Sequence, residues 1–236
     1  VYLVLRPEDG LGDGFVMEWI AGESLGARIN RSENLTAARA GLARECGGAL
    51  ARIHSIDLDS TGLRDVLGEA GPEDSVRLTW KRYQGFGSPQ PMIDFTARWL
   101  LDHLPPDGEV ALVHGDFRNG NLVVNPTGMG AVLDWEIAHI GDPMRDLGWL
   151  CTSSWRFGYP EQPVGGFGSY KDLFAGYEEE SGRVVDLEHV RFWEVFGSFW
   201  WSIGCLGMAD QYRTGPDRSV ERAAIGRRSS ECQVDC

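Results

Sequence analysis

Two short polar segments, separated by a stretch that can form one β-hairpin, constrain this chain more than any other feature. Residues 114–121 read His-Gly-Asp-Phe-Arg-Asn-Gly-Asn, and residues 132–136 read Val-Leu-Asp-Trp-Glu. Between them lie two short apolar runs, 122–125 and 131–133, joined by a Pro-Thr-Gly turn at 126–128. We therefore expect Asn121, at the start of the hairpin, and Asp134, at its end, to be neighbours.

The chemistry of these residues favours a site for a hard cation. A carboxylate and an amide oxygen that converge in this way suit Mg²⁺, which takes a few oxygen ligands and keeps waters. Asp116 lies in a loop with Gly115 and Gly120, five residues before Asn121. It could face the metal without ligating it, as a general base should. Asp, Asn and Gly also build ordinary turns, but their joint spacing around a hairpin favours a functional site.

The rest of the chain reads as helices around this small β insert. Apolar spacing predicts helices over 35–53 and 92–103, and the second should stop at Pro105. Residues 57–91, rich in Gly, Pro and Asp, are expected to form a long connection with at most a short helix. Further strands are expected at 1–5, 15–19 and 110–113.

Two other patterns have competing interpretations. The Gly-rich stretch 8–14 is read as a hairpin turn and not as a phosphate loop, because Phe15 stands where a third glycine would be needed. Beyond Asp146 the chain looks helical again. There an apolar stripe is expected in the core, with pocket lining as the alternative; its members are Phe192, Val195, Phe196, Phe199, Trp200 and Ile203.

Composition excludes some partners and leaves others open. The net charge of −13, from 35 acidic and 22 basic residues, argues against nucleic acid. The same charge is compatible with a cationic substrate or with a surface that serves only solubility. No apolar run approaches the roughly 20 residues of a membrane helix. Five cysteines without a Cys-x-x-Cys pattern predict reduced thiols and a cytoplasmic location.

Three motifs together resemble a known family. Residues 114–121, the Asp-Trp-Glu at 134–136 and the Gly-Asp-Pro-Met-Arg-Asp-Leu at 141–147 resemble the aminoglycoside phosphotransferase/choline kinase family. The resemblance is closest to the branch that includes the kinase-like domain of acyl-CoA dehydrogenase family members. Residues 15–22, 49–54 and 193–196 also resemble that branch. The resemblance implies an α/β, protein-kinase-like fold: a mainly helical C-lobe with a small β hairpin, plus a remnant of the N-lobe sheet.

The resemblance also implies roles for the polar residues. Asp116 would accept or orient the proton of the substrate hydroxyl, and Asn121 and Asp134 would hold Mg²⁺ on the nucleotide phosphates. Glu136 would reach a second metal or make a structural hydrogen bond. Arg118 would stabilise the transferred charge or form a salt bridge.

Further residues would support the loop and the nucleotide. His114 and Asp146 would act as structural braces of the catalytic loop. Met17, Glu18 and Ile20 would form the hinge between the lobes, where main-chain groups of Glu18 and Ile20 bond the adenine edge.

The bounds of the chain relative to the family's two lobes lead to one further expectation, about nucleotide binding. Residues 1–20 would supply the end of the N-lobe sheet and the hinge, and 21–236 the C-lobe, with both ends truncated. The family's glycine loop and phosphate-binding Lys would precede the hinge, and neither is found in these 236 residues. Phosphoryl transfer depends on such positioning groups. We therefore expect this chain by itself to bind nucleotide poorly and to be inactive.

The predicted function is an ATP-dependent, Mg²⁺-dependent O-phosphotransferase acting on a small hydroxylated metabolite, with GTP as an open alternative donor. A catalytically dead nucleotide-binding domain is the rival. Retention of Asp116, Asn121 and Asp134 together favours the enzyme. Protein substrates are less favoured, because no activation-loop signature lies between Asp134 and Asp146. The sequence leaves open the acceptor and the oligomeric state.

Overall fold

The computed structural model describes residues 1–106, 108–216 and 218–236. Its strands are β1 (Leu3–Val4), β2 (Phe15–Val16), β3 (Glu69–Ala70), β4 (Ala111–Val113), β5 (Leu122–Asn125), β6 (Gly128–Val132) and β7 (His139–Gly141). Its α-helices are α1 (Gly26–Arg31), α2 (Thr36–His54), α3 (Pro72–Gln84), α4 (Pro91–Asp102), α5 (Met144–Cys151), α6 (Tyr170–Ser181), α7 (Leu187–Thr214), α8 (Val220–Gly226) and α9 (Ser229–Val234). Short 3₁₀ turns occupy Pro7–Asp9, Glu33–Leu35, Leu63–Asp65 and Ser153–Trp155.

The central hairpin forms as the sequence predicts. Strands β5 and β6 pair antiparallel, from Leu122 opposite Val132 to Asn125 opposite Gly128, around a two-residue turn. The second strand begins at residue 128, three residues earlier than expected, because the turn is tighter than the Pro-Thr-Gly triplet suggested. Beside this hairpin, β7 pairs antiparallel with β4 and parallel with β3.

The predicted helices over 35–53 and 92–103 are confirmed as α2 and α4. The expectation of a long connection with at most a short helix over 57–91 is wrong, because α3 runs for 13 residues there. Pro72 begins the helix, where its missing N–H costs nothing. Only a narrow stripe of α3 is buried, including Val76 and Tyr83. Because most of its other residues are polar, the helical spacing of apolar residues is weak in this part of the sequence.

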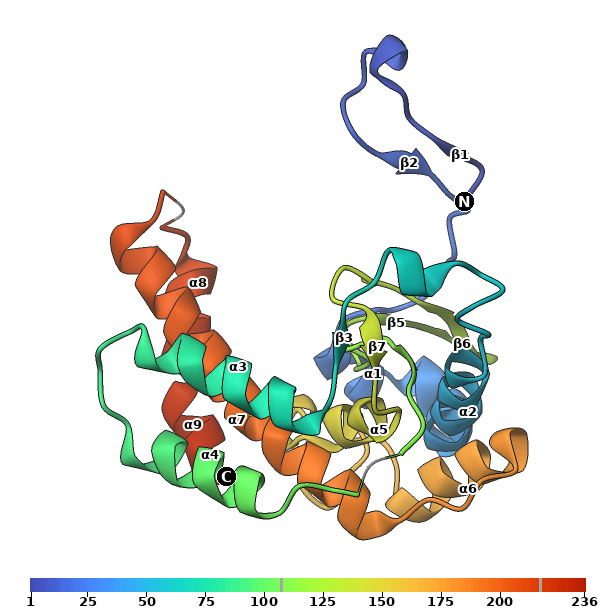
Figure 1. Ribbon diagram of the computed structural model, residues 1–236. Helices are drawn as coiled ribbons and strands as arrows, with labels where there is room; N and C mark the ends of the chain where they lie inside the picture. Colours follow the sequence, from blue (N-terminus) through green and yellow to red (C-terminus); the bar gives the residue numbers. More distant parts are fainter. Residues whose placement is uncertain (107, 217) are drawn as a thin grey trace.

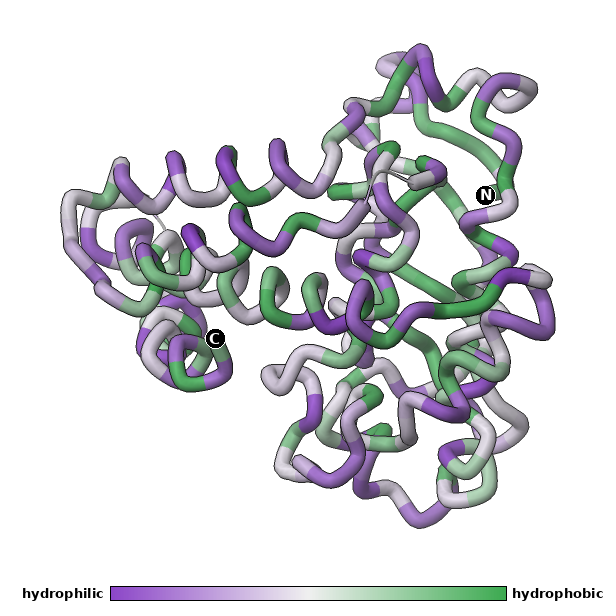
Figure 2. Tube along the Cα trace, turned by 60° about the horizontal axis from the view of Figure 1, so that its bottom comes forward, coloured by the Kyte–Doolittle hydropathy of each residue, from purple (hydrophilic) through white to green (hydrophobic). Residues whose placement is uncertain are grey.

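Two groups of buried residues form the interior. One joins α2, α5 and α6 to strands β4, β5 and β7, and the other joins α3, α4 and α7. Figure 1 shows the second group as a helical arm, with α8 at its outer end and α9 packed along α7. Hydropathy alternates along the turns of these helices in Figure 2, as expected for helices that bury one face.

The apolar stripe of α7 is confirmed as core. Phe192, Phe196, Phe199 and Ile203 are buried, and Val195 and Trp200 are half-buried against the same group. Within the described parts of the chain, no helix is long and apolar enough to cross a membrane.

The N-terminal hairpin stands away from the rest of the molecule (Figure 1). Its strands pair Leu3 with Val16 and Val4 with Phe15, so the expected hairpin exists with strands of two residues each. The expected turn between them contains the 3₁₀ turn Pro7–Asp9. Large apolar side chains are exposed here, among them Val4 at 70% and Trp19 at 90%. A two-stranded ribbon of this kind gains little stability by itself.

Candidate active site

The loop after β4 is held by one buried carboxylate from α5. Oδ1 of Asp146 accepts the backbone N–H of Gly115, and Oδ2 accepts that of His114, both at 2.8 Å. Gly115 has φ +83°, and a Cβ there would lie 2.9 Å from the carbonyl oxygen of Ile137. The loop can therefore approach the segment after β6 only with glycine at this position.

Asp146 also accepts a hydrogen bond from His54 at the end of α2, with Nε2 at 3.1 Å from Oδ2. The other ring nitrogen of His54 lies 3.1 Å from the hydroxyl of Tyr177. Burial by itself raises a carboxyl pKa, but the hydrogen bond and charge of His54, with the hydrogen bond from the backbone N–H of His114, hold the pKa of Asp146 below its ordinary 3.8. The carboxylate is thus kept ionised in a site with no exposure to solvent.

His114 connects the loop to the end of the hairpin. Its Nδ1 accepts the backbone N–H of Asp116 at 3.1 Å, so the proton is on Nε2, which donates to the carbonyl of Leu133 at 2.9 Å. The imidazole is fully buried. His114 and Asp146 thus both hydrogen-bond main-chain groups of the loop.

The Asp116 carboxylate receives three donors. Oδ1 accepts Nε of Arg118 at 2.9 Å and the indole Nε1 of Trp149 at 2.8 Å. Oδ2 accepts Nδ2 of Asn121 at 2.6 Å. A carboxylate offers about four lone-pair positions, so one position remains, on Oδ2.

Arg118 forms a salt bridge with Asp116, which was the alternative to stabilising the charge of the transferred group. Besides the bond to Asp116, its guanidinium lies 4.3 Å from the ring centroid of Trp155. Its side chain is 22% exposed. The cation is therefore stacked beside Asp116 in this structure.

Asn121 and Asp134 lie side by side at the open end of the hairpin. Because Nδ2 of Asn121 contacts two acceptors, the carbonyl and Oδ2 of Asp116, its Oδ1 is the atom left for another partner. Asp134 is exposed and has φ +65°, a left-handed conformation uncommon for residues other than glycine. Such strained positions cluster at ligand sites.

Glu136 is exposed two residues beyond Asp134. No group of three or more His, Cys, Asp or Glu side chains that could hold a metal occurs among the described residues. An ion held by the Asp134 carboxylate and the amide oxygen of Asn121 would therefore need further ligands from outside the chain. Oxygen donors of this type fit Mg²⁺.

A cavity of about 650 Å³ adjoins these residues. One wall is the segment after β2, with Met17, Glu18 and Ile20, and the other is residues 132–136. Glu23 anchors the first wall through a pair of backbone hydrogen bonds with Val124 of β5, at 2.8 and 2.9 Å. The structure thus brings the predicted hinge residues to the same cavity as Asp134 and Glu136.

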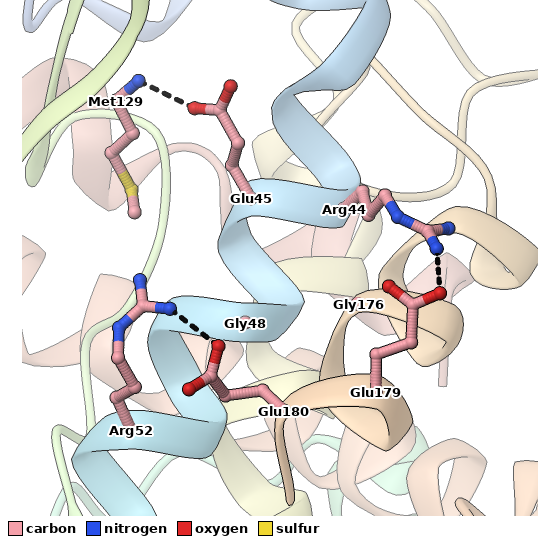
Figure 3. Close-up of a pocket in the computed structure, with 8 residues that line it drawn as sticks. All are labelled: Arg44, Glu45, Gly48, Arg52, Met129, Gly176, Glu179 and Glu180. Atoms are coloured by element: carbon pink, nitrogen blue, oxygen red, sulfur yellow. Dashed lines mark hydrogen bonds and ion pairs between the residues drawn. The ribbon is translucent and has the colours of Figure 1, made fainter.

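A second cavity, of about 340 Å³, lies between α2, α6 and the β5–β6 hairpin (Figure 3). Its charged side chains pair with one another: Arg52 with Glu180 at 2.9 Å, and Arg44 with Glu179. Glu45 accepts the backbone N–H of Met129 at 2.7 Å. These contacts stabilise the packing of the three elements, and we do not take this cavity as the functional site.

Sequence reasoning missed two residues that contact the site. His54 lies in a segment that resembles the family, but no role was predicted for it. Trp149 is near the end of α5, 33 residues from Asp116. No local pattern signals either contact, because both depend on how helices pack against the loop.

The sequence of this chain matches the family described as "Phosphotransferase enzyme family" over residues 2–182. It is 40% identical over 109 residues to acyl-CoA dehydrogenase family member 10 of Mus musculus, which is 44% of this chain and 10% of that protein. It is 42% identical over 103 residues to family member 11 of Gallus gallus, covering 42% of this chain and 13% of that protein. The matches therefore span only a small part of those longer relatives.

Solved structures show the same fold. A Ralstonia eutropha protein assigned as an aminoglycoside phosphotransferase superposes with a TM-score of 0.73 and 25% identity, covering 93% of this chain and 70% of that one. A choline/ethanolamine kinase family protein of Mesorhizobium loti gives 0.56 and 17%, covering 93% and 68%. The GDP complex of an aminoglycoside 2′-phosphotransferase-IIIa mutant gives 0.63 and 14%, covering 92% and 68%. With a family match over most of its length and this fold, the chain belongs to the phosphotransferase enzyme family.

Proposed function

We propose that this protein transfers the γ-phosphoryl group of ATP to a hydroxyl group of a small molecule, with Mg²⁺ on the phosphates. The observation that carries the proposal is the position of Asn121. Its Nδ2 holds Oδ2 of Asp116 at 2.6 Å, and its backbone carbonyl accepts the N–H of Leu133, the residue before Asp134, at 2.7 Å. One residue can thus fix the distance between a base and a metal site.

In this proposal Asp116 is the general base. The acceptor hydroxyl oxygen attacks the γ-phosphorus, the bond from that phosphorus to the leaving oxygen of the nucleoside diphosphate breaks, and the hydroxyl proton passes to Asp116. Asn121 and Asp134 would hold Mg²⁺, with Glu136 available for a second ion. Bound there, Mg²⁺ would neutralise charge on the phosphates.

The cavity between the hinge and residues 132–136 is the proposed nucleotide site. Main-chain groups of Glu18 and Ile20 would bond the base, and Met17 and Trp135 would contact its faces. Recognition by main-chain groups leaves GTP as an alternative donor, and one fold neighbour was solved with GDP. We assign residues 1–20 to the hinge side of the nucleotide and 21–236 to the catalytic lobe.

The charge of this cavity supports a further part of the proposal. Its lining contains three carboxylates, from Glu18, Asp134 and Glu136, and no Lys or Arg. A triphosphate would therefore meet repulsion here unless cations offset it. We propose that these 236 residues by themselves show no ATP turnover. We also propose a cytoplasmic location, where the five cysteines would stay reduced.

The rival function is a nucleotide-binding domain without catalysis. The two are separated by a transfer screen with γ-labelled ATP and the full-length protein, against aminoglycosides, choline-like alcohols, hydroxyacyl thioesters and sugars. We expect at least one acceptor to be phosphorylated, and Asp116→Asn to lower kcat by a factor on the order of 10²–10⁴. Asp102→Asn, at an exposed position, is the control and should leave kcat unchanged. Full turnover by Asp116→Asn would remove the base from the mechanism.

A further inference from the structure

Trp149 is the one of the three donors to Asp116 that comes from a helix outside the loop. It lies in α5 and is 4% exposed, and its indole N–H reaches Oδ1 of Asp116 at 2.8 Å. The other two donors, Arg118 and Asn121, belong to the same loop as the carboxylate. A donor on a packed helix can fix the carboxylate relative to the body of the lobe, which loop residues cannot do by themselves.

The orientation of this indole is strongly determined. Its ring contacts Trp155 at 5.0 Å between centroids and Trp200 at 5.2 Å, both edge to face. On α7, a Cβ at Gly197 would lie 3.0 Å from the Trp149 ring and 2.3 Å from Oγ1 of Thr152. The absence of a side chain at 197 therefore lets the indole lie directly against the α7 backbone.

Counting lone pairs then distinguishes the two oxygens of Asp116. Oδ1 accepts both Arg118 and Trp149, which occupies its two lone pairs. Oδ2 accepts Asn121 and keeps one lone pair. The proton of an acceptor hydroxyl can thus be received at Oδ2 while Oδ1 stays anchored.

We infer that Trp149 is a positioning residue for phosphoryl transfer: by holding Oδ1, it directs Oδ2 of Asp116 toward the acceptor hydroxyl. The inference rests on the proposed function, in which Asp116 is the base. The effect on rate follows from geometry, since displacement of a reacting group by about 1 Å can cost on the order of 10²-fold.

The test compares Trp149→Phe with Trp201→Phe in the full-length protein. Trp201 belongs to the same aromatic cluster, 5.2 Å from Trp155, and its buried Nε1 has no hydrogen-bond partner among the described residues. Both changes keep an aromatic ring and remove an indole N–H. We expect Trp149→Phe to lower kcat on the order of 10–100-fold with KM for the nucleotide unchanged. Trp201→Phe should change neither.

Two further measurements keep the test decisive. Replacing Trp149 by benzothienylalanine, which keeps the shape of the indole but lacks the N–H, should reproduce the kinetic effect if Trp149→Phe is poorly folded. In the ¹⁵N-indole NMR spectrum, Asp116→Ala should shift the Trp149 resonance and leave that of Trp201 in place. Unchanged kcat in the benzothienylalanine variant, or an unmoved Trp149 resonance, overturns the inference. Full activity of Asp116→Asn would instead refute the proposed base, whatever the NMR spectrum shows.

Discussion

Leu133 and Asn121 are joined by a backbone hydrogen bond of 2.7 Å, from the N–H of Leu133 to the carbonyl of Asn121. The bond extends the pairing of β5 and β6 beyond Leu122 and Val132, the last pair of the ladder. Asp134, the next residue, then turns away in a left-handed conformation. The hairpin thus places the two proposed metal ligands together at its open end, although twelve residues separate them.

This arrangement predicts an order of effects on metal binding. Asp134→Ala should abolish the tightening of nucleotide binding by Mg²⁺, because a carboxylate is the strongest ligand that the chain offers a hard cation there. Asn121→Ala should weaken the effect less, since a neutral amide stabilises less charge, and Glu136→Gln least of all. Calorimetric titration with and without Mg²⁺ measures the order. A larger loss in Asn121→Ala would show that Asp134 is not the principal ligand.

The carboxylates around the nucleotide cavity predict how ligands respond to Mg²⁺. Without Mg²⁺, adenosine should bind the 236-residue chain at least as tightly as ATP, because the triphosphate is repelled by Glu18, Asp134 and Glu136. With Mg²⁺, ATP should gain affinity and adenosine should not. Quenching of Trp135, which lines the cavity and is 40% exposed, reports binding, and Trp135→Phe is the control. Tight ATP binding in the presence of a chelator would contradict the placement of the site.

The lowered pKa of Asp146 predicts that the protein loses stability at acid pH. Its pKa in the folded protein lies below the ordinary 3.8. Its contribution to stability is therefore complete above pH 3.8 and is lost as the pH falls through the folded pKa. Asp146→Asn should lower the free energy of unfolding near neutral pH by about 2 kcal/mol or more.

The same variant should remove the part of the acid destabilisation that Asp146 causes. Urea melts between pH 3 and pH 7 give both quantities. Asp102→Asn, at an exposed position, should leave the pH dependence as it is. If Asp146→Asn and the wild type lose stability in parallel below pH 3.8, the carboxylate is not ionised as the hydrogen bonds require.

The crossing of α2 and α6 predicts opposite effects for two glycines of one helix. A Cβ at Gly47 would lie 2.0 Å from the carbonyl oxygen of Leu173 in α6, so Gly47→Ala should destabilise the protein by about 1–3 kcal/mol or more. Gly41 has nothing closer than Glu45 Oε1 at 3.8 Å. Gly41→Ala should therefore stabilise α2 by about 0.5–1 kcal/mol. Thermal melts of the two variants measure these effects. Equal shifts of Tm in the two variants would mean that α2 and α6 are not in close contact at Gly47.

The site could be predicted only as far as local patterns extend. The hairpin was readable because its two apolar runs are adjacent in sequence, and α2 and α4 because their apolar residues recur at helical spacing. Helix α3 was missed because most of its surface is polar, so the packing of a few residues such as Val76 and Tyr83 outweighs composition. The contacts of His54 and Trp149 were missed for another reason: they join elements 92 and 33 residues from their partners.

The family motifs, the hairpin and the polar residues at its ends could all be read from local patterns in the sequence. These features depend on residues that are close in sequence, and the preferences of such residues for turns and strands predict the local structure. Which atoms of those residues make hydrogen bonds depends instead on how distant elements pack in the folded protein. The packing of α5 against α7 brings Trp149 to Oδ1 of Asp116, and the end of α2 brings His54 to Asp146. A hydrogen bond requires donor and acceptor atoms within about 3 Å of each other. For residues so far apart in sequence, only the packing of the folded elements brings the two atoms that close.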